Sequence, residues 1–374
     1  MLTRRAIVGP LAVGGAAAAF GARALSPAVE RDAPAGPTLG ALASARGLLY
    51  GSATSTFQLG DADFAGVLAR EARILVAEYE MKRSSIQPQA GSYNFAPADA
   101  LLRFAQAHRM AMRGHTLVWH KSNPPWLEDA LQSPRKEAVL TGYIETVAAR
   151  YRGQMHSWDV VNEALAPGGG RSDGLRDTLW LKAFGPSYID LAFHAARSAD
   201  PGALLVYNDE GCEGGFAEHE RFRAATLDFL EGALARGAPI GAYGMQGHLQ
   251  AFGTKIDQVK LRDFLAHVKA LGLRILVTEH DVDDSGGTLD VGERDRAVAD
   301  ASRRFLDVVL DSGATIAVLT WGLSDRFLDF PGMRAAVMGY SPRTLPLDAA
   351  LARKPMWQAM TRVFGSAPHS LTAD

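Results

Sequence analysis

Cysteine is almost absent from this sequence of 374 residues. Cys212 is the single cysteine, so no disulfide can form within the chain. Hydrophobic residues make up 47% of the chain, which is ample for a sizeable core without cross-links. The lack of disulfides therefore does not argue against export from the cell.

An excess of charge of either sign is also absent. Lysine and arginine number 39 against 41 aspartates and glutamates, for a formal net charge of −2. We expect no nucleic-acid partner, because binding a polyanion needs a broad basic surface. Long uninterrupted apolar runs are missing too. The run Ala6–Phe20 is short and contains glycine and proline, so we expect no stable membrane anchor.

The first 24 residues have the layout of a secretory signal peptide. Arg4 and Arg5 precede the apolar run, and Ala22-Arg23-Ala24 offers a cleavage site of small residues. The paired arginines favour the twin-arginine type of signal, with an ordinary signal as the alternative. We therefore expect an exported protein, periplasmic or extracellular.

The rest of the chain is predicted to form one domain with short flanks. Residues 25–39, rich in Pro, Ala and Gly, predict a flexible linker, and residues 366–374 predict a polar tail. Between them, residues 40–365 contain no internal linker, and short apolar runs alternate with amphipathic stretches. The predicted strands are Gly47–Ser52, Arg73–Met81, Met110–Val118, Ser157–Val161, Ala203–Asn208, Gly241–His248, Leu273–Thr278 and Ala314–Trp321.

Eight strands alternating with helices are typical of a (β/α)8 barrel, although a doubly wound sheet gives the same alternation. The amphipathic stretches include Ala98–His108, Arg135–Tyr151, Ile189–Ala199, Glu218–Arg236, Gln258–Leu271 and Arg294–Asp311.

Polar residues at the strand ends favour the barrel. Chemically capable side chains follow the apolar strands at 78–82, 114–120, 162–163, 208–209, 246–248, 279–281 and 321–322. In a barrel all these ends converge on one face, where active sites lie, whereas an open sheet spreads them along an edge. We therefore predict a single-domain α/β fold, the (β/α)8 or TIM barrel.

Two glutamates stand out among these polar residues. Glu163 and Glu279 each end a run that should be buried, at the fourth and seventh predicted strands. Burial shifts the pKa of a carboxyl group. Two carboxylates that face each other across a cleft are what glycoside cleavage needs, because one protonates the leaving oxygen and the other attacks.

Five collinear motifs carry a resemblance to a known family. They are Gly-His-Thr-Leu-Val-Trp-His at 114–120, Trp-Asp-Val-Val-Asn-Glu-Ala at 158–164, Gly-Met-Gln-Gly-His-Leu at 244–249, Val-Thr-Glu-His-Asp-Val at 277–282 and Thr-Trp-Gly at 320–322. The chain resembles the family 10 glycoside hydrolases, the endo-β-1,4-xylanases, over residues 50 to 357.

The resemblance implies a retaining hydrolase that works through a glycosyl-enzyme intermediate, with Glu163 as acid/base and Glu279 as nucleophile. It implies a β-linked polysaccharide or oligosaccharide as substrate; we expect no cofactor, no metal and a monomer. Residues implied to bind the sugar are Lys82, His115, Trp119, Asn162, Gln246, His248 and Trp321. Asp281, Asn208 and Asp209 are implied to support them, and His248 is expected to lie between Glu279 and Asp281.

Several positions depart from the family's pattern, mostly away from the cleaved sugar. They are Tyr79, Arg83, Ser122, Glu210, Gly211 and Phe327. We infer the family's chemistry with altered substrate recognition. Arg83 could bind an acidic substituent such as a uronic acid, or could simply be a solvated arginine.

Three other functions remain open at this stage. One is a metal-dependent hydrolase, because His115, His120, His248 and His280 all lie near strand ends, although no compact metal-ligand motif is present. The second is a non-catalytic glycan-binding protein. The third is the same chemistry on another β-glycoside or on a short substituted oligosaccharide, because fold does not determine substrate.

Overall fold

The computed structural model describes residues 36–328 and 339–369. The predicted signal peptide, most of the predicted linker and the end of the predicted tail lie outside the described residues. Helix α14 ends at Ser366, where the polar tail is predicted to begin.

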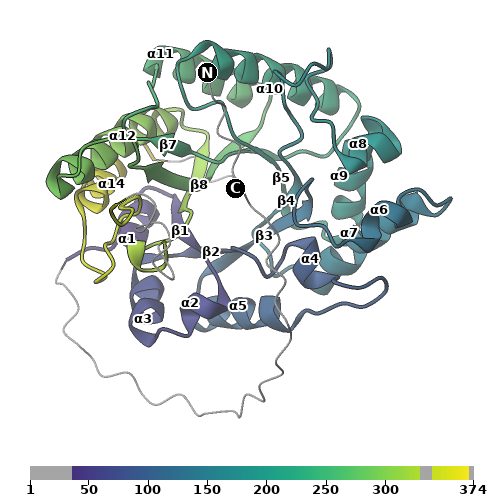
Figure 1. Ribbon diagram of the computed structural model, residues 1–374, viewed down its shortest axis with the longest axis horizontal. Helices are drawn as coiled ribbons and strands as arrows, with labels where there is room; N and C mark the ends of the chain where they lie inside the picture. The colour runs from purple at the N-terminus through teal and green to yellow at the C-terminus, as the bar shows by residue number, and fades with distance from the viewer. Residues whose placement is uncertain (1–35, 329–338, 370–374) are drawn as a thin grey trace. The chain divides into compact units, whose positions relative to one another are not determined.

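Eight parallel strands close into a barrel, which confirms the predicted fold (Figure 1). Each strand pairs with the next along the chain, and the cylinder closes where β1 pairs with β9. The barrel strands are β1 Leu49–Thr54, β2 Ile74–Ala77, β3 Ala111–Val118, β4 Ser157–Asn162, β5 Leu204–Asp209, β6 Ala242–Met245, β8 Arg274–Asp283 and β9 Thr315–Thr320.

Side chains along each strand point alternately to the inside of the barrel and outward to the surrounding helices. In β2, Ile74 and Val76 belong to the cluster inside the barrel, whereas Leu75 and Ala77 belong to the larger core under the helices. In β8, Leu276 belongs to the inner cluster. Successive side chains of a strand point to opposite faces, so both faces of every strand need apolar residues. This is why the strands appear in the sequence as nearly continuous apolar runs.

A ring of helices surrounds the strands (Figure 1). The helices are α1 Leu39–Ser44, α2 Thr56–Leu59, α3 Ala62–Glu71, α4 Arg83–Ile86, α5 Ala96–Ala107, α6 Trp126–Ala130, α7 Lys136–Arg150, α8 Leu179–Phe184, α9 Ser187–Ala199, α10 Ala217–Ala235, α11 Gln258–Ala270, α12 Val291–Asp311 and α14 Pro355–Ser366, with a 3-10 turn at Asp325–Phe327. The six predicted amphipathic stretches coincide with α5, α7, α9, α10, α11 and α12 to within about one turn.

One predicted strand is divided in two. The stretch Gly241–His248 forms β6 and then, after a break, the start of the short strand β7 His248–Gln250, which pairs with β8. Gly247 lies between them with a φ of 81°, a left-handed conformation that a continuous strand does not allow. The break turns His248 toward the end of β8, where it pairs with Asp281.

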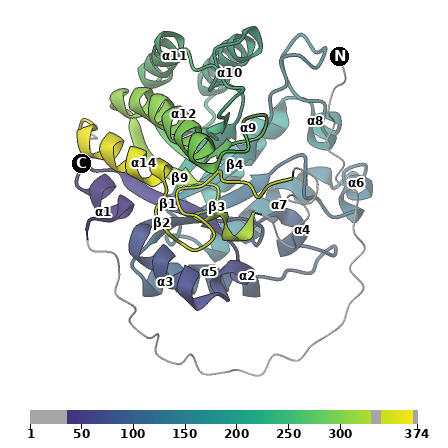
Figure 2. The ribbon, with the colours of Figure 1, turned by 60° about the vertical axis from the view of Figure 1, so that its left-hand side comes forward.

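The first and last helices of the barrel are tied together by one buried carboxylate. Helix α14 lies beside α12 in both views (Figures 1 and 2) and packs against α1. Glu71, at the end of α3, accepts hydrogen bonds from the Leu39 backbone N–H at 2.8 Å and the Trp357 indole at 3.2 Å. It also pairs with Arg353 at 2.9 Å. Glu71 therefore joins the two ends of the folded chain.

Within residues 36–328 and 339–369, no helix has both the length and the hydropathy that a membrane crossing requires.

Candidate active site

Glu163 directly follows β4, at the end of the barrel where the strands' carboxyl ends meet. Its backbone is left-handed, with a φ of 54°, a conformation that costs a residue with a side chain on the order of 1–3 kcal/mol. Two hydrogen bonds hold it there. The Glu163 N–H donates to the Asn208 carbonyl at 2.9 Å, and the Glu163 carbonyl accepts from Arg176 Nε at 2.9 Å. The fold thus aims this side chain into the barrel mouth.

Glu279 lies in β8 and is nearly fully buried. Asn208 Nδ2 donates to its Oε1 at 2.9 Å, and His248 Nε2 lies 3.4 Å from its Oε2. Burial alone would raise the pKa of Glu279, but the hydrogen bond from His248 and the nearby imidazoles of His115 and His248 lower it to about 2. Glu279 is therefore ionised over the whole ordinary pH range, as a nucleophile must be.

His248 lies between Glu279 and Asp281. Its Nδ1 is 2.8 Å from Asp281 Oδ1, on the side opposite to the contact with Glu279. Burial lowers the pKa of His248, but the two carboxylates outweigh it and hold this pKa well above its usual value. His248 is therefore a cation that keeps the buried Glu279 charged.

Amide side chains connect the two glutamates. Asn208 Nδ2 bridges Glu279 and the Asn162 side-chain oxygen, which it reaches at 2.8 Å. Asn162 Nδ2 and Gln246 Nε2 each lie 3.3 Å from Glu163 Oε1. The structure thus brings together five of the residues predicted for the site. Asn208, predicted only to support the site, contacts Glu279 directly.

Asp209 follows Asn208 as the last residue of β5 and is fully buried. It accepts from the Tyr207 hydroxyl and from the Leu165 and Glu210 N–H groups. Burial raises the pKa of Asp209 to about 7, although these donors oppose the shift. Asp209 holds the loops after β4 and β5 and does not contact either glutamate.

Lys82, His115, Trp119 and Trp321 line the barrel mouth beside the two glutamates. Lys82 Nζ lies 5.1 Å from the centre of the Trp119 ring and 5.6 Å from that of Trp321. The rings of His115 and Trp321 meet edge to face at 5.4 Å. A cation and ring faces side by side suit a sugar, which presents both hydroxyls and an apolar face.

A buried charge network orients His115. His115 Nδ1 lies 2.9 Å from Asp159 Oδ2, and Asp159 also pairs with Arg113, which is fully buried. Arg113 Nε donates to Ser157 Oγ at 3.0 Å. The peptide bond after His115 is cis. Asp159 was not among the predicted site residues, although it lies inside the motif that contains Glu163.

Two further side chains that the sequence analysis did not assign to the site contact Glu163. Lys121 Nζ lies 3.3 Å from Glu163 Oε2, and His120 Nε2 lies 3.8 Å from the same oxygen. Burial would raise the pKa of Glu163, but the charge of Lys121 and hydrogen bonds bring it below its usual value. A charged residue directly after the motif 114–120 is the sequence signal that could have identified Lys121.

The hypothesis for Arg83 was wrong in both of its forms. Arg83 is only 4% exposed, so it is neither solvated nor free to bind a uronic acid. Its guanidinium lies 4.1 Å from the ring centre of Tyr143 and 5.5 Å from those of Trp126 and Trp180. Arg83 begins the helix α4, and its side chain points inward among these aromatic rings. The faces of the rings stabilise the buried guanidinium through cation–π attraction.

The other positions that depart from the family's pattern are placed as follows. Tyr79 is 56% exposed, and Lys82 Nζ lies 5.0 Å from its ring centre. Phe327 packs against Phe64 at 4.9 Å between ring centres. The carbonyl of Ser122 accepts from the Ser84 N–H at 2.9 Å.

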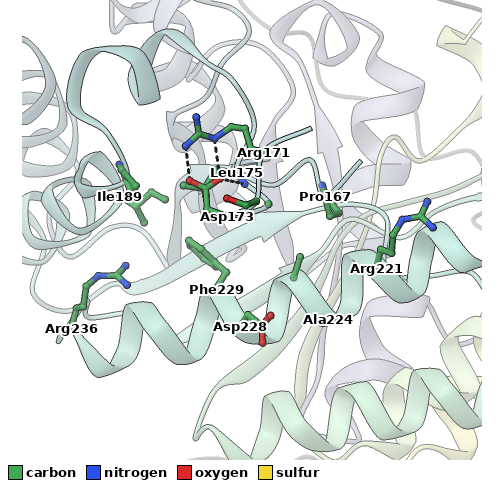
Figure 3. Close-up of a pocket in the computed structure, with 14 residues that line it drawn as sticks. Pro167, Arg171, Asp173, Leu175, Ile189, Arg221, Ala224, Asp228, Phe229 and Arg236 are labelled. Atoms are coloured by element: carbon green, nitrogen blue, oxygen red, sulfur yellow. Dashed lines mark hydrogen bonds and ion pairs between the residues drawn. The ribbon is translucent and has the colours of Figure 1, made fainter. Parts of the chain in front are cut away.

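Two hollows lie near the loops after β4 and β5. One of about 370 Å³ adjoins His248, and its lining includes Glu210, Gly211, Glu213, Phe216, His219 and Gln250. The other, of about 470 Å³, lies against α10, with the paired Arg171 and Asp173 on its rim (Figure 3). None of the predicted site residues lines this second hollow.

The histidines at the strand ends are engaged in other contacts. His280 is fully buried, with its two ring nitrogens 2.8 Å from the Gly247 carbonyl and 2.9 Å from Ser302 Oγ. In the part of the chain that the structure describes, no group of three or more His, Cys, Asp or Glu side chains is arranged to hold a metal ion.

A family model, curated relatives and solved structures all match this chain to the same family of proteins. The model of glycosyl hydrolase family 10 matches residues 38–363. Endo-1,4-beta-xylanase B of Thermotoga neapolitana is 32% identical over 314 residues, which cover 83% of this chain and 86% of that protein. The crystal structure of xylanase 10B from Thermotoga petrophila RKU-1 in complex with xylobiose superimposes with a TM-score of 0.76 at 30% identity, over 88% of this chain and 98% of that one.

Some relatives are much longer. Endo-1,4-beta-xylanase C of Paenibacillus barcinonensis is 33% identical over 79% of this chain, but the match spans only 28% of that protein.

Proposed function

The chain belongs to glycosyl hydrolase family 10, and on that premise we propose that it is a retaining endo-β-1,4-xylanase that hydrolyses xylan or xylooligosaccharides. The observation that carries the proposal is a pair of buried carboxylates in the barrel mouth joined by amide side chains. The names of its relatives support xylan as the substrate.

The two glutamates divide the work of a double displacement. The Glu279 carboxylate attacks the anomeric carbon while Glu163 gives its proton to the departing oxygen, so the glycosidic bond breaks and a glycosyl-enzyme forms. Glu163 then takes a proton from water, the water oxygen attacks the same carbon, and Glu279 leaves. Two inversions restore the β configuration.

The surrounding side chains bind the sugar and stabilise the transition state. Asn162 and Gln246 are placed to donate to sugar hydroxyls next to Glu163, and Lys82 and Trp321 also line the barrel mouth. Hydrogen bonds that tighten as charge develops at the anomeric carbon lower the barrier. No cofactor is needed for either step.

The experiment follows product release from β-1,4-xylan and from xylooligosaccharides, with the first-formed anomer read by NMR. Initial β-anomer release from internal bonds is expected. Glu163→Gln should lower kcat/KM for xylan far more than kcat/KM for an aryl xylobioside with a good leaving group, because kcat/KM reports the first displacement and only xylan needs a proton donor there. Glu279→Gln should stop both. Well-folded protein that leaves xylan intact would contradict the proposed substrate.

A specific observation favours a variant of this function. Tyr79 presents a half-exposed ring beside Lys82, where the family's pattern has asparagine. A ring stacks on a sugar face without reading individual hydroxyls, so short or substituted β-linked oligosaccharides are the second candidate substrates. Higher kcat/KM for plain xylan than for every substituted oligosaccharide would decide against them.

We also propose that the protein is exported and acts as a monomer. Export is supported by Arg4, Arg5 and the small residues at 22–24. Arg4→Lys together with Arg5→Lys should retain the protein in the cytoplasm if the twin-arginine route carries it. If the double variant is still exported, the signal is an ordinary secretory signal. If neither the unaltered protein nor the variant is exported, the proposal of export is wrong.

A further inference from the structure

The turn that follows β3 places a cation on Glu163. The Trp119 carbonyl accepts hydrogen bonds from Asn123 Nδ2 at 2.9 Å and Trp180 Nε1 at 2.7 Å. Ser122 is left-handed, with a φ of 52°, and its carbonyl is bound by the Ser84 N–H. Lys121 lies between these fixed points, so its backbone position is determined by the fold.

The Lys121 side chain reaches one particular oxygen. Its Nζ lies 3.3 Å from Glu163 Oε2, while the other oxygen of Glu163 receives the neutral amides of Asn162 and Gln246. The same Nζ lies 5.2 Å from the centre of the Trp119 ring. Just over half of the Lys121 side chain is exposed, but the Glu163 carboxyl is buried, so water screens this pair only from one side.

The other charges around Glu163 do not replace Lys121. On the same turn, His120 Nε2 lies 3.8 Å from Glu163, but burial lowers the pKa of His120 to about 4, so it is neutral above that pH. Arg176, from the loop after β4, donates to the backbone carbonyl of Glu163 and not to its side-chain carboxyl. Lys82, after β2, lies over the Trp119 and Trp321 rings, and its charge acts on Glu279 and Glu78 more strongly than on Glu163.

Three acidic side chains also lie near Glu163. Glu279 comes from β8, and its field is offset by the cation His248, from β7. Glu210, after β5, is half-buried, and burial together with Glu163 raises the pKa of Glu210. Asp209, the last residue of β5, is fully buried and accepts from the Tyr207 hydroxyl and two backbone N–H groups. Lys121 is thus the cation, among the described residues, that pairs directly with the Glu163 carboxylate.

We propose that Lys121 is a positioning residue that holds Glu163 in its ionised form and thereby confines xylan cleavage to the acidic side of neutrality. The inference rests on the proposed function, in which Glu163 must carry a proton when the first bond breaks. A neighbouring cation favours the proton-free form, so Glu163 loses its proton at a lower pH than it would alone. The alkaline limb of the pH profile of kcat/KM then lies at correspondingly low pH.

Lys121→Met is the variant that tests this role. Its alkaline limb should move to higher pH, and its kcat/KM for xylan above the wild-type optimum should rise roughly threefold to tenfold. Lys121→Arg keeps the charge and should leave the limb near its original position. Lys182→Met removes one exposed lysine of α8, whose ion-pair partner is Asp177, and serves as the matched control for the change in net charge.

Two further measurements make the outcome decisive. An aryl xylobioside with a good leaving group needs no proton from Glu163, so Lys121→Met should leave its alkaline limb unchanged. Carbon-13 NMR of labelled glutamate, assigned with Glu163→Gln, should show the Glu163 carboxyl titrating at higher pH in Lys121→Met. The NMR titration can be measured even if the variant has no activity.

The two ways of failing are distinguishable. If Glu163→Gln cleaves xylan as fast as the unaltered protein, the proposed function itself is wrong. If the alkaline limb depends on Glu163 but stays in place in Lys121→Met, and the Glu163 carboxyl titrates unchanged, only the role of Lys121 is overturned.

Discussion

His248 shows how a single side chain can set the state of a catalytic group. It contacts Glu279 with one ring nitrogen and Asp281 with the other, and these two carboxylates keep it protonated. A buried carboxylate without such a partner would have a raised pKa. The low pKa of Glu279 is therefore a property of this trio of side chains.

Replacing His248 should shift the acid limb of activity. In His248→Asn the cation is lost, so the pKa of Glu279 rises from about 2 and the acid limb of kcat/KM moves to higher pH. We expect kcat/KM to fall on the order of tenfold to a hundredfold, because one charged donor to the nucleophile is removed. His267→Asn, on the outer face of α11, is the control. An acid limb that stays in place would show that His248 does not hold Glu279 ionised.

The positions of the site residues were predictable from the sequence to different degrees. Glu163 and Glu279 could be predicted because each is a charged residue at the end of an otherwise buried run. The direction of Lys121 could not, because it depends on the left-handed turn at Ser122. Arg83 was misassigned for a similar reason: a short helix begins at this residue and turns its side chain inward.

At the scale of elements, strands β3 and β4 are joined by an indole ring of β4 that lies directly against a glycine of β3. Gly114 is paired with Trp158 across the two strands. A Cβ added at Gly114 would lie 2.0 Å from the Trp158 ring, which is fully buried and bound through its indole N–H to Asp200. The ring has no room to retreat, so only glycine fits beside it.

Gly114→Ala should therefore be severely destabilising. We expect the free energy of unfolding to fall by about 3 kcal/mol or more, because the overpacked ring forces the strands apart. Gly142→Ala, in the middle of α7 with nothing within 4 Å of the added Cβ, should instead raise it by about 0.5–1 kcal/mol. Chemical denaturation of both variants measures the difference. Equal midpoints would contradict the close packing of Gly114 on Trp158.

The elements that the sequence predicts best are long and strongly patterned. Helices α10 and α12, of 19 and 21 residues, repeat their apolar face over several turns. Short helices such as α2 and α8, of 4 and 6 residues, carry too few turns for a period to appear. Strand β7 was merged with β6 because one glycine conformation, at Gly247, is all that separates them.

At the scale of the whole molecule, the barrel is closed by contacts between distant parts of the chain. Glu71 gathers the Leu39 backbone, the Arg353 guanidinium and the Trp357 indole. These partners come from the two ends of the described chain. The eight-fold alternation predicts that a barrel closes, but no local pattern indicates which buried carboxylate joins its ends.

Removing this carboxylate should loosen the closure. Glu71→Ala leaves a buried N–H, an indole and a mostly buried arginine without their acceptor, so we expect a loss of roughly 3–5 kcal/mol in the free energy of unfolding. Glu220→Ala, which breaks the exposed pair with Lys260, should cost less than about 1 kcal/mol. Thermal unfolding followed by circular dichroism compares the two. If Glu71→Ala and Glu220→Ala have the same melting temperature, the closure of the barrel does not depend on Glu71.

The burial of Cys212 has a practical consequence. Its thiol is fully enclosed, and burial raises the pKa of Cys212 to about 12, so the thiolate that alkylating reagents attack is scarcely formed near neutral pH. A second cysteine introduced on the barrel rim, for example by Tyr79→Cys, would then react almost alone. A fluorescent label or a solid support could be attached there in one step, with the native thiol left in place.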